Sequence, residues 1–542
     1  MPPAHGTVIA QVVDASGFPY PVNHLTLAPQ DVFESDENQF KRIDAEQSPT
    51  LIPGVSSSRY IGVIESGTYS LSDLYSYHIF GEYYYQDLIT ATPAFGTFEV
   101  RPNQLTNLGT ILFYAKPDGD QYSEVLARND SFEDGPDLLR ARYPAIARDL
   151  TNLDAPLRWN RDDFAEERFS NYLSVVQNPT AFNEVVEYED EVVVLAKAGA
   201  ILRRDAFGDW TLDAVESDLN LLSHDRNSHG DEIVAGEFGT IFVRESGSAG
   251  WSRVRPPDPF TSIPAAAISD DRTIFVYLQT DTNVTLYSGS ISGVPDWRAV
   301  MQYLPGLDWL LLDQQGEVVN MPDRAKLENR TRRKISKAGF ANVSGQHFFI
   351  ENGRVFDMNY DSLTVSKLDL GFKVSSIAPF KKFHVATTNP SIWDLDMDTH
   401  VGESWSGEWW QVRQRKDACP DEDRRSGASI CMNSQTRRYT SMDFLGYPLF
   451  VSKDTGYAIM KRSVSGIARS QPNTPILAIT SDGGASWVEY VGQDDFPKFA
   501  NLILPSTKPG FLTVVSNGST GKIYDFEIEE KTFELRWEPN TF

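Results

Sequence analysis

The carboxylates between residues 394 and 400 have the spacing that most suggests a metal site. Asp394, Asp396 and Asp398 alternate with Leu395 and Met397, as in a loop that coordinates calcium. A calcium loop of that type also needs a glycine at its turn and a glutamate at its twelfth position, and neither follows here. The alternation is equally typical of a half-buried strand. The three aspartates are therefore minor metal candidates, and the sequence predicts neither a metal nor a cofactor.

Other residues with catalytic potential lack the pattern that their chemistry requires. His224 and His229 are five residues apart, but a polar turn explains them without a metal. The Gly-x-Ser-x-Gly and His-Glu-x-x-His motifs are absent, and so is a glycine loop for phosphate. These absences favour a binding function over catalysis.

The two cysteines, Cys419 and Cys431, are twelve residues apart in a polar segment. A disulfide between them would close a short loop and stabilise the protein by about 3 kcal/mol. We predict this bond, which is typical of an oxidising compartment. Two unpaired thiols are the alternative. A zinc site would need further ligands that the neighbouring sequence does not supply.

The segment 413–440 is much longer than an ordinary connection of 4–6 residues, and such long loops are commonly functional. It concentrates arginines on a chain with a net charge of −26 and follows three tryptophans. Tryptophan and arginine dominate interface hot spots because they bury large areas or form bidentate hydrogen bonds. We predict a binding surface formed by Trp405, Trp409, Trp410, Arg413, Arg415, Arg424, Arg425, Arg437 and Arg438. The alternative is a solvated lid without a ligand.

A repeat of strand-forming runs must position these residues. Trp210, Trp251 and Trp297 end successive runs of β-branched and aromatic residues, 41 and 46 residues apart, and the series resumes at Trp410. Such periods are typical of the blades of a β-propeller. Two further units without a terminal tryptophan are expected around 309–319 and 347–356, the second with an Asn352-Gly353 hairpin turn. The count predicts eight blades, with seven as the alternative.

Residues 480–487 read Thr-Ser-Asp-Gly-Gly-Ala-Ser-Trp, which resembles the Asp-box of the sialidase (BNR) superfamily of β-propellers. Asp482 is placed to accept hydrogen bonds from the turn, Gly484 permits a positive φ, and Trp487 supplies a large ring to bury. We therefore expect Asp482, Gly484 and Trp487 to be structural. An active sialidase would also need an arginine triad announced by an Arg-Ile-Pro-like motif, which is absent. The chain is more similar to non-catalytic propellers of the photosystem II assembly-factor type, whose blades carry strands like Gly239-Thr240-Ile241.

The N-terminal 115 residues contain six or seven short strand-like runs, which favour a small Ig-like β-sandwich. The runs around Gly67-Thr68-Tyr69, 98–102 and 108–111 resemble small sandwich modules of bacterial cell-envelope lipoproteins. Residues 116–180 have helical character around 136–150 and enough aromatic residues to form a structured connector. We therefore expect an all-β protein with a sandwich at 1–115, a short, partly helical connector at 116–180 and a propeller at 181–542.

The composition restricts the partners. With 49 Lys and Arg against 75 Asp and Glu, the surface repels nucleic acid and anionic membranes. The sequence contains no run of 18 apolar residues, so it predicts no membrane-spanning helix. The chain begins without a signal-like segment, so it is either cytoplasmic or has lost a leader, and the disulfide expectation favours the second.

The sequence thus predicts a non-catalytic protein-interaction scaffold of the bacterial cell envelope, periplasmic or at the cell surface. Its partner would be a protein component of an envelope assembly, bound through the propeller face, and a lipid anchor would be carried by the removed leader. The alternatives are a propeller-type glycoside hydrolase or lyase, or a glycan-binding protein.

Overall fold

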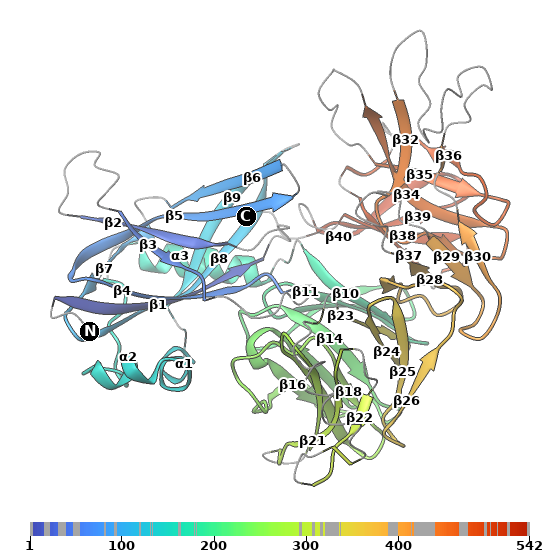
Figure 1. Ribbon diagram of the computed structural model, residues 1–542. Helices are drawn as coiled ribbons and strands as arrows, with labels where there is room; N and C mark the ends of the chain where they lie inside the picture. The colour runs from blue at the N-terminus through green and yellow to red at the C-terminus, as the bar shows by residue number, and fades with distance from the viewer. Residues whose placement is uncertain are drawn as a thin grey trace.

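In the computed structural model, two N-terminal sheets and three helices are followed by seven further sheets (Figure 1). Among the described residues, no helix is both long and apolar enough to cross a lipid bilayer. The structure describes residues 4–15, 22–30, 40–46, 55–80, 83–91, 95–118, 121–130, 132, 134–160, 164–177, 179, 181–291, 295–305, 309–314, 318–319, 335, 338–388, 399–412, 415–416, 439–465, 475–492, 496–498, 500–506, 508–516 and 521–538.

The N-terminal part is the expected β-sandwich. One sheet has the order β4-β1-β8-β9, with β1 and β8 parallel, and the other has the order β3-β2-β5-β6 with β7 beside β5. Apolar side chains from both sheets meet in one core, where Val8 of β1, Leu25 of β2 and Ile111 of β8 are fully buried. The strands are β1 (His5–Asp14), β2 (His24–Pro29), β3 (Lys41–Asp44), β4 (Ser58–Glu65), β5 (Gly67–Phe80), β6 (Tyr83–Thr90), β7 (Thr97–Val100), β8 (Leu105–Asp118) and β9 (Gln121–Asn129).

The helical segment that follows lies against this sandwich. The helices are α1 (Gly135–Arg142), α2 (Pro144–Asp149) and α3 (Ala165–Gln177), and Pro144 separates the first two. Trp159 packs edge-on against Phe98 and donates a hydrogen bond of 2.7 Å to the carbonyl oxygen of Leu108. The boundary expected at residue 115 falls inside β8, and β9 continues the same sheet, so sandwich strands extend into the segment expected to be the connector.

The seven remaining sheets are built from consecutive antiparallel strands and are the blades of the propeller. Blades 1 and 2 comprise β10 (Phe182–Glu187), β11 (Val192–Ala196), β12 (Ala200–Arg204), β13 (Trp210–Ala214), β14 (Leu221–Arg226), β15 (Glu232–Gly236), β16 (Ile241–Arg244) and β17 (Ser252–Arg253). Blades 3 and 4 comprise β18 (Ala266–Ile268), β19 (Thr273–Gln279), β20 (Val284–Ser290), β21 (Arg298–Tyr303), β22 (Trp309–Leu311), β23 (Ala338–Val343), β24 (Gln346–Glu351), β25 (Arg354–Asn359) and β26 (Thr364–Leu368).

Blades 5 to 7 complete the series. Blade 6 has more strands than the others, because both β32 and β33 pair with β34 and the two-residue strand β31 pairs with β32. The strands are β27 (Ser376–Ile377), β28 (His384–Thr387), β29 (Thr399–Gly402), β30 (Trp409–Val412), β31 (Arg415–Lys416), β32 (Tyr439–Phe444), β33 (Leu449–Phe450), β34 (Gly456–Ser465), β35 (Pro475–Thr480), β36 (Val488–Val491), β37 (Leu502–Pro505), β38 (Phe511–Val515), β39 (Ile523–Glu527) and β40 (Thr532–Trp537).

Neighbouring blades share hydrophobic clusters all around the ring. Separate clusters join blades 1 and 2, blades 2 and 3, blades 3 and 4, and blades 4 and 5. One larger cluster contains buried side chains of blades 5, 6, 7 and 1, including Val194 of blade 1 and Val514 of blade 7. Arg204 of β12 adds polar contacts at this seam, donating to Thr513 Oγ1 at 2.5 Å and to the carbonyl oxygen of Pro505 at 2.7 Å. The ring is therefore closed by side-chain packing between its first and last blades.

The described residues form seven blades, so the predicted count of eight was wrong and the alternative of seven holds. The unit expected around 309–319 is not a separate sheet. Trp309–Leu311 pairs with β21 as the fifth strand of blade 3, and Leu312 forms a single bridge with Val318. A run of three apolar residues cannot reveal from sequence alone whether it starts a sheet or extends the preceding one.

The sandwich is fixed to blades 1 and 2 by a buried carboxylate. Glu237 is fully buried. Its carboxylate accepts hydrogen bonds from the backbone amides of Ser56 (2.7 Å), Ser57 (3.0 Å) and Asn220 (3.2 Å), and from the Ser57 hydroxyl. Four donors from both sides of the interface therefore satisfy one carboxylate.

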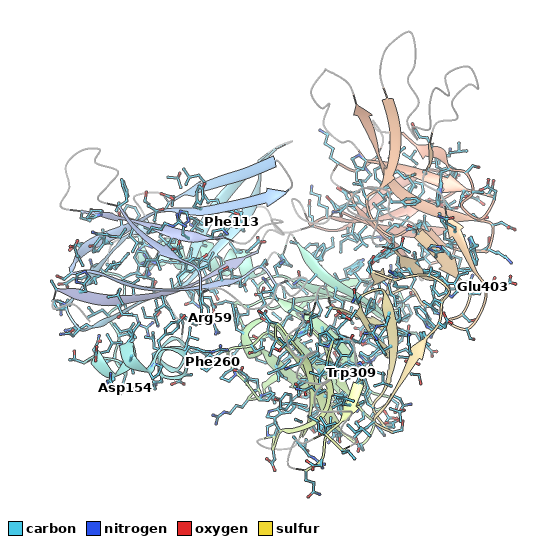
Figure 2. All side chains as sticks on the ribbon, viewed as in Figure 1. Arg59, Phe113, Asp154, Phe260, Trp309 and Glu403 are labelled. Atoms are coloured by element: carbon cyan, nitrogen blue, oxygen red, sulfur yellow. The ribbon has the colours of Figure 1, made fainter. Side chains whose placement is uncertain are left out.

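The residue after this carboxylate makes a second contact across the interface. Phe238 has a left-handed backbone, with φ 48°, and its ring lies 3.9 Å from the guanidinium carbon of Arg59. Arg59 is a residue of β4 and lies on the side of the sandwich that faces the propeller (Figure 2). A bulky residue adopts this backbone conformation at a cost, so the surrounding contacts must hold it. The sandwich and the propeller thus interlock through side chains of both.

We predict that Arg204→Met weakens ring closure. The substitution keeps an unbranched apolar side chain but removes the guanidinium group, so Thr513 and the Pro505 carbonyl lose their donor, which should cost about 2–4 kcal/mol in the free energy of unfolding. Urea denaturation measures the change. Arg298→Met, at an exposed position of blade 3, is the control and should change the stability by no more than about 0.5 kcal/mol. Equal stability of the two variants would contradict a closing role for Arg204.

Candidate functional site

The centre of the ring contains a cavity of about 360 Å³. Five blades contribute to its wall, so it exists only in the closed ring. Most of the wall is apolar or carries uncharged amides, and Glu184 is its one carboxylate. The lining residues are Phe182, Asn183, Glu184, Val185, Phe340, Ala341, Asn342, Ile377, Pro379, Leu445, Gly446, Tyr447, Asn501 and Leu502. We call this the channel cavity.

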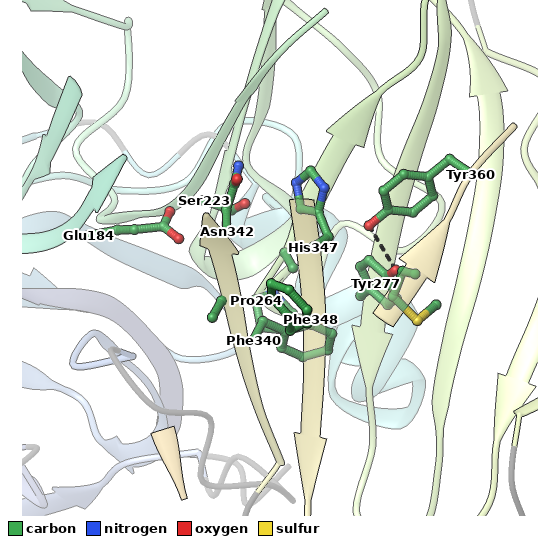
Figure 3. A pocket seen from close by; sticks show the side chains of 12 residues that line it. Glu184, Ser223, Pro264, Tyr277, Phe340, Asn342, His347, Phe348 and Tyr360 are labelled. Carbon is green, nitrogen blue, oxygen red and sulfur yellow. Dashed lines mark hydrogen bonds between the residues drawn. The ribbon is translucent and has the colours of Figure 1, made fainter. Parts of the chain in front are cut away.

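Strands from blades 1, 2 and 4 approach one another across the centre. The Ser344 hydroxyl donates to the carbonyl oxygen of Glu187 at 2.6 Å, and the Asn342 amide donates to the carbonyl oxygen of His224 at 2.9 Å. Beside these contacts lies a second cavity of about 10 Å³, large enough for one water-sized group. It shares Glu184, Phe340, Ala341 and Asn342 with the channel cavity. We call it the inner cavity (Figure 3).

Glu184 stands between the two cavities. Its Oε2 atom accepts a hydrogen bond of 3.2 Å from the backbone amide of His224, and no ion pair to it occurs among the described residues. Burial raises the pKa of Glu184 to about 8, against the lowering effect of the His224 amide, and the charge of Asp225 raises it further. Glu184 is therefore a neutral acid near pH 7, in a site where its ionised form has no cation to stabilise it.

The ring of His347 also lines the inner cavity, and in the view of Figure 3 it lies beyond Asn342 from Glu184. It is 6% exposed, and neither ring nitrogen has a hydrogen-bond partner within the described part of the chain. Its Nε2 atom is 3.7 Å from Asp225 Oδ1, while Asp225 Oδ2 accepts the amide of Ile268 at 2.9 Å. Buried polar groups are almost always satisfied, so an imidazole without a partner on a cavity marks a position where a polar group can bind.

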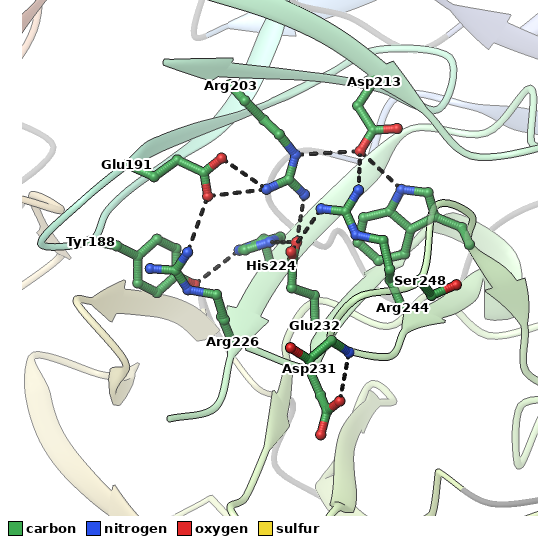
Figure 4. Close-up of polar contacts among 12 residues, drawn as sticks. Tyr188, Glu191, Arg203, Asp213, His224, Arg226, Asp231, Glu232, Arg244 and Ser248 are labelled. Atoms are coloured by element: carbon green, nitrogen blue, oxygen red, sulfur yellow. Dashed lines mark hydrogen bonds and ion pairs between the residues drawn. The ribbon is translucent and has the colours of Figure 1, made fainter. Parts of the chain in front are cut away.

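A polar network between blades 1 and 2 is by contrast fully satisfied (Figure 4). Arg203 contacts Glu191, Asp213 and Glu232 at 3.1, 3.3 and 2.5 Å, and Arg244 contacts the last two at 2.9 and 2.7 Å. Burial would raise the pKa of Glu232, but hydrogen bonds and charges from its basic neighbours outweigh burial and hold that pKa well below its usual range. Every charge here has an opposite partner, which indicates a structural joint between the blades.

The tryptophans predicted to bind a partner lie at blade contacts. Trp405 stacks on His384 and packs on Phe348, and Trp405 and Trp409 join the cluster between blades 4 and 5. Trp410 joins the cluster of blades 5, 6, 7 and 1 and donates a hydrogen bond of 2.9 Å to the carbonyl oxygen of Gly483. The three rings are partly buried, and the structure does not bring all three together on one surface.

Most of the other predicted residues lie outside the described part of the chain. These are Arg413, Arg424, Arg425, Arg437 and Arg438 of the predicted binding surface, Cys419 and Cys431 of the predicted disulfide, and the metal candidates Asp394, Asp396 and Asp398. Arg415 lies in β31, and only its backbone is described. Among the residues that are described, no group of three or more His, Cys, Asp or Glu side chains is placed to hold a metal.

The turn at 480–487 joins β35 to β36, and its side chains behave as structural residues. Asp482 accepts hydrogen bonds from the Thr480 hydroxyl (2.8 Å), the Ser486 amide (2.9 Å) and the Ser486 hydroxyl (2.5 Å). Gly484 has φ 85°, and a Cβ atom there would lie 2.7 Å from a Val412 methyl group. Trp487 is 1% exposed. The turn therefore supports the packing of blade 6 against blade 5.

Sequence reasoning did not identify Glu184, Asn342 or His347. Each is a polar residue within or beside an otherwise apolar run, as in Phe182-Asn183-Glu184-Val185-Val186. A carboxyl group in the strand that lines the centre of a blade was the available signal. The sequence does not show that blades 1 and 4 meet across the channel, so it does not reveal the cluster.

No protein-family model matches the chain, and no curated protein matches it. Similar solved structures include YCF48 bound to a D1 peptide, with 11% identity and a TM-score of 0.36 over 63% of this chain and 93% of that chain. BamB from Moraxella catarrhalis has 13% identity and a TM-score of 0.29 over 62% and 92%. PorZ, a surface component of the type-IX secretion system of Porphyromonas gingivalis, has 10% identity and a TM-score of 0.28 over 91% and 51%. These TM-scores are low, so the architecture rests on the sheet order and packing of this chain itself.

We predict that Glu184 makes the protein less stable as the pH rises. Because its pKa is raised from 4.5 to about 8 on folding, the folded state holds a proton that the unfolded state has lost between these values. Its stabilising contribution is complete below about pH 4.5 and falls as the pH rises to about 8. Thermal melts from pH 5 to 9 should show a smaller decline in Tm for Glu184→Gln than for the wild type. Glu189→Gln, at an exposed position of the same blade, should follow the wild type. Parallel profiles for all three proteins would contradict the assignment.

We also predict that Asp482→Ala destabilises the propeller by about 1–2 kcal/mol, because the turn loses three hydrogen bonds. Urea denaturation measures this effect. Ser481→Ala, at the neighbouring exposed position, is the control and should remain within about 0.5 kcal/mol of the wild type. A loss of partner binding without a change in stability would show that the turn is an interaction site.

Proposed function

We propose that this protein is a non-catalytic interaction scaffold of the bacterial cell envelope that binds a protein partner through the channel face of its propeller. The observation that carries this proposal is the channel cavity, whose wall comes from five blades and is mostly apolar, with amide groups at Asn183, Asn342 and Asn501. Apolar walls with a few placed polar groups are typical of binding sites. The Asn183 and Asn342 amides donate to the carbonyl oxygens of Leu221 and His224, which fixes their positions in this wall.

The alternative, a glycoside hydrolase or lyase, needs two carboxylates facing one substrate. Among the residues that line the channel cavity, Glu184 is the single carboxylate. Asp225 lies nearby, but its two oxygens face Ile268, Asn342 and His347. This arrangement favours binding over hydrolysis. A glycan ligand is the remaining alternative, and the experiment below separates it from a protein.

Three further parts of this proposal rest on the sequence. The arginine-rich segment between blades 5 and 6 would extend the binding face, with Trp405, Trp409 and Trp410 supporting its base. The hydrogen bonds of Asp482 support classifying the turn at 480–487 as an Asp-box. The Cys419 to Cys431 disulfide, the periplasmic or cell-surface location and a lipid anchor on a removed leader belong to the same proposal.

Blocking the channel tests the proposed function. Asn183→Trp places an indole in the channel cavity, and Ala206→Trp places the same residue on an exposed turn at the outer edge of the same blade. Purified wild type and both variants are crosslinked to a cell-envelope extract, and the captured proteins and glycans are identified by mass spectrometry. We expect one protein enriched by wild type and Ala206→Trp, and at least about tenfold less of it with Asn183→Trp, since filling a binding pocket removes most of its affinity.

Circular dichroism and thermal melts confirm that both variants fold. A third variant, in which a Gly/Ser linker replaces residues 417–438, shows whether the arginine-rich segment contributes to capture. Equal capture by the wild type and Asn183→Trp would contradict binding through the channel. Enrichment of a glycan instead of a protein would favour the glycan alternative.

A further inference from the structure

The channel cavity and the inner cavity adjoin each other, and the first is large while the second is very small. The channel cavity, at about 360 Å³, has apolar walls that include Phe340, Ile377 and Leu445. The inner cavity has room for one water-sized group and adjoins the channel cavity along four shared residues. An unbranched aliphatic chain that ends in a small polar group fits these two volumes. The residues that line the inner cavity then determine the chemistry of this polar group.

The inner cavity has polar atoms whose hydrogen-bonding capacity is unused. One oxygen of Glu184 and both ring nitrogens of His347 have no hydrogen-bond partner among the described residues. In the view of Figure 3, the Asn342 amide lies between the Glu184 carboxyl group and the His347 ring. Neither cavity has a lysine or arginine among its lining residues. A group that donates hydrogen bonds therefore meets no cationic side chain here and has the free oxygen of Glu184 and the His347 ring as partners.

The charge and the aromatic walls indicate that this group is a cation. Asp225 is close enough for its charge to raise the pKa of Glu184, and the rings of Tyr277, Phe340 and Tyr360 line the inner cavity. Negative charge and aromatic faces both attract a cation. An ammonium is a compact point charge with three donors, whereas a guanidinium is a larger planar fork. A cavity for one water-sized group therefore favours the ammonium.

We propose that the two cavities form a site for a primary ammonium group on an unbranched aliphatic chain, with the ammonium between Glu184 and His347 and the chain in the channel cavity. In a protein partner this group is a lysine side chain. The lysine assignment rests on the function proposed above, but the site itself is a property of these residues and is testable without the partner.

Binding should release a proton. Near pH 7 the carboxyl group of Glu184 is neutral, and an ammonium beside it favours the ionised form. The titratable groups around Glu184 are Tyr188, His224, Asp225, Tyr277, His347 and Tyr360. Affinity should therefore rise between pH 6 and pH 8, as the proton on Glu184 becomes easier to remove, and fall above the pKa of the amine, about 10.4 for a lysine side chain.

The test uses n-butylammonium as the probe, with n-butanol and butyrate as neutral and anionic molecules of the same chain length. Isothermal titration calorimetry of the full chain in two buffers of different ionisation enthalpy measures both affinity and proton release. We expect saturable binding of n-butylammonium alone, with proton release, and a dissociation constant at least about tenfold higher for Glu184→Gln than for the wild type, as expected when one charge-assisted hydrogen bond is lost. Glu189→Gln should bind n-butylammonium as the wild type does. His347→Phe keeps an aromatic ring at this position but removes its nitrogens, so it should weaken binding.

Three outcomes would overturn the site: no saturable binding to the folded wild type, equal affinity for n-butanol, or an unchanged affinity in Glu184→Gln. The small probe separates this inference from the proposed function. If n-butylammonium fails to bind while Asn183→Trp still abolishes capture of the partner, the ammonium site is wrong and the channel function stands. If n-butylammonium binds while Asn183→Trp captures the partner normally, the site stands and the proposed function is wrong.

Discussion

The packing of the last blade against the first is the constraint on which the rest of the propeller depends. Each blade is a sheet with apolar side chains on both faces, so each needs a neighbour on either side. A closed ring meets that need for all seven blades. In this protein no blade is shared between strands from the two ends of the described propeller, so the seam is held by apolar packing and by Arg204. The channel cavity is a product of this closure, since its wall comes from blades on both sides of the seam.

The sandwich is tied to the same part of the ring that supplies the site. Glu237 and Phe238, which hold the sandwich, belong to blade 2, and Lys197 of blade 1 donates to the Ser56 hydroxyl at 2.7 Å. Blades 1 and 2 also carry Glu184, His224 and Asp225. A displacement of the sandwich would therefore act directly on one wall of the two cavities. The polar network around Arg203 joins these two blades through ion pairs.

The sequence predicted those features that depend on local patterns. The Asn352-Gly353 turn joins β24 to β25 with φ of 56° and 78°, because both residue types tolerate this conformation. The sandwich, the helical segment around 136–150 and the repeating blades also follow from local runs of residues. The blade count failed at Trp309–Leu311, where the choice between a new sheet and an added strand depends on partners distant in the sequence.

The candidate site was not predictable from local patterns. Glu184 of β10 and His347 of β24 are separated by more than 160 positions in the sequence, and both line the inner cavity because the turn between β23 and β24 reaches β10 across the channel. The tryptophans at 405–410 show that one sequence pattern can fit two different structural roles. Aromatic residues beside a long basic segment suggest an interface, yet partly buried rings between blades have the same composition. Composition alone does not separate a ring that packs inside the fold from one that meets a partner.

The distance along the chain between the two sides of the seam has a consequence for biosynthesis. Arg204 and Thr513 are 309 residues apart. At a synthesis rate of about 5–20 residues per second, the ribosome needs about 15–60 seconds to add the chain between them. During that interval the apolar flank of blade 1 has no partner, and such surfaces aggregate or recruit chaperones. The first blade therefore exposes this apolar flank for longer than any other blade surface that the ring later covers.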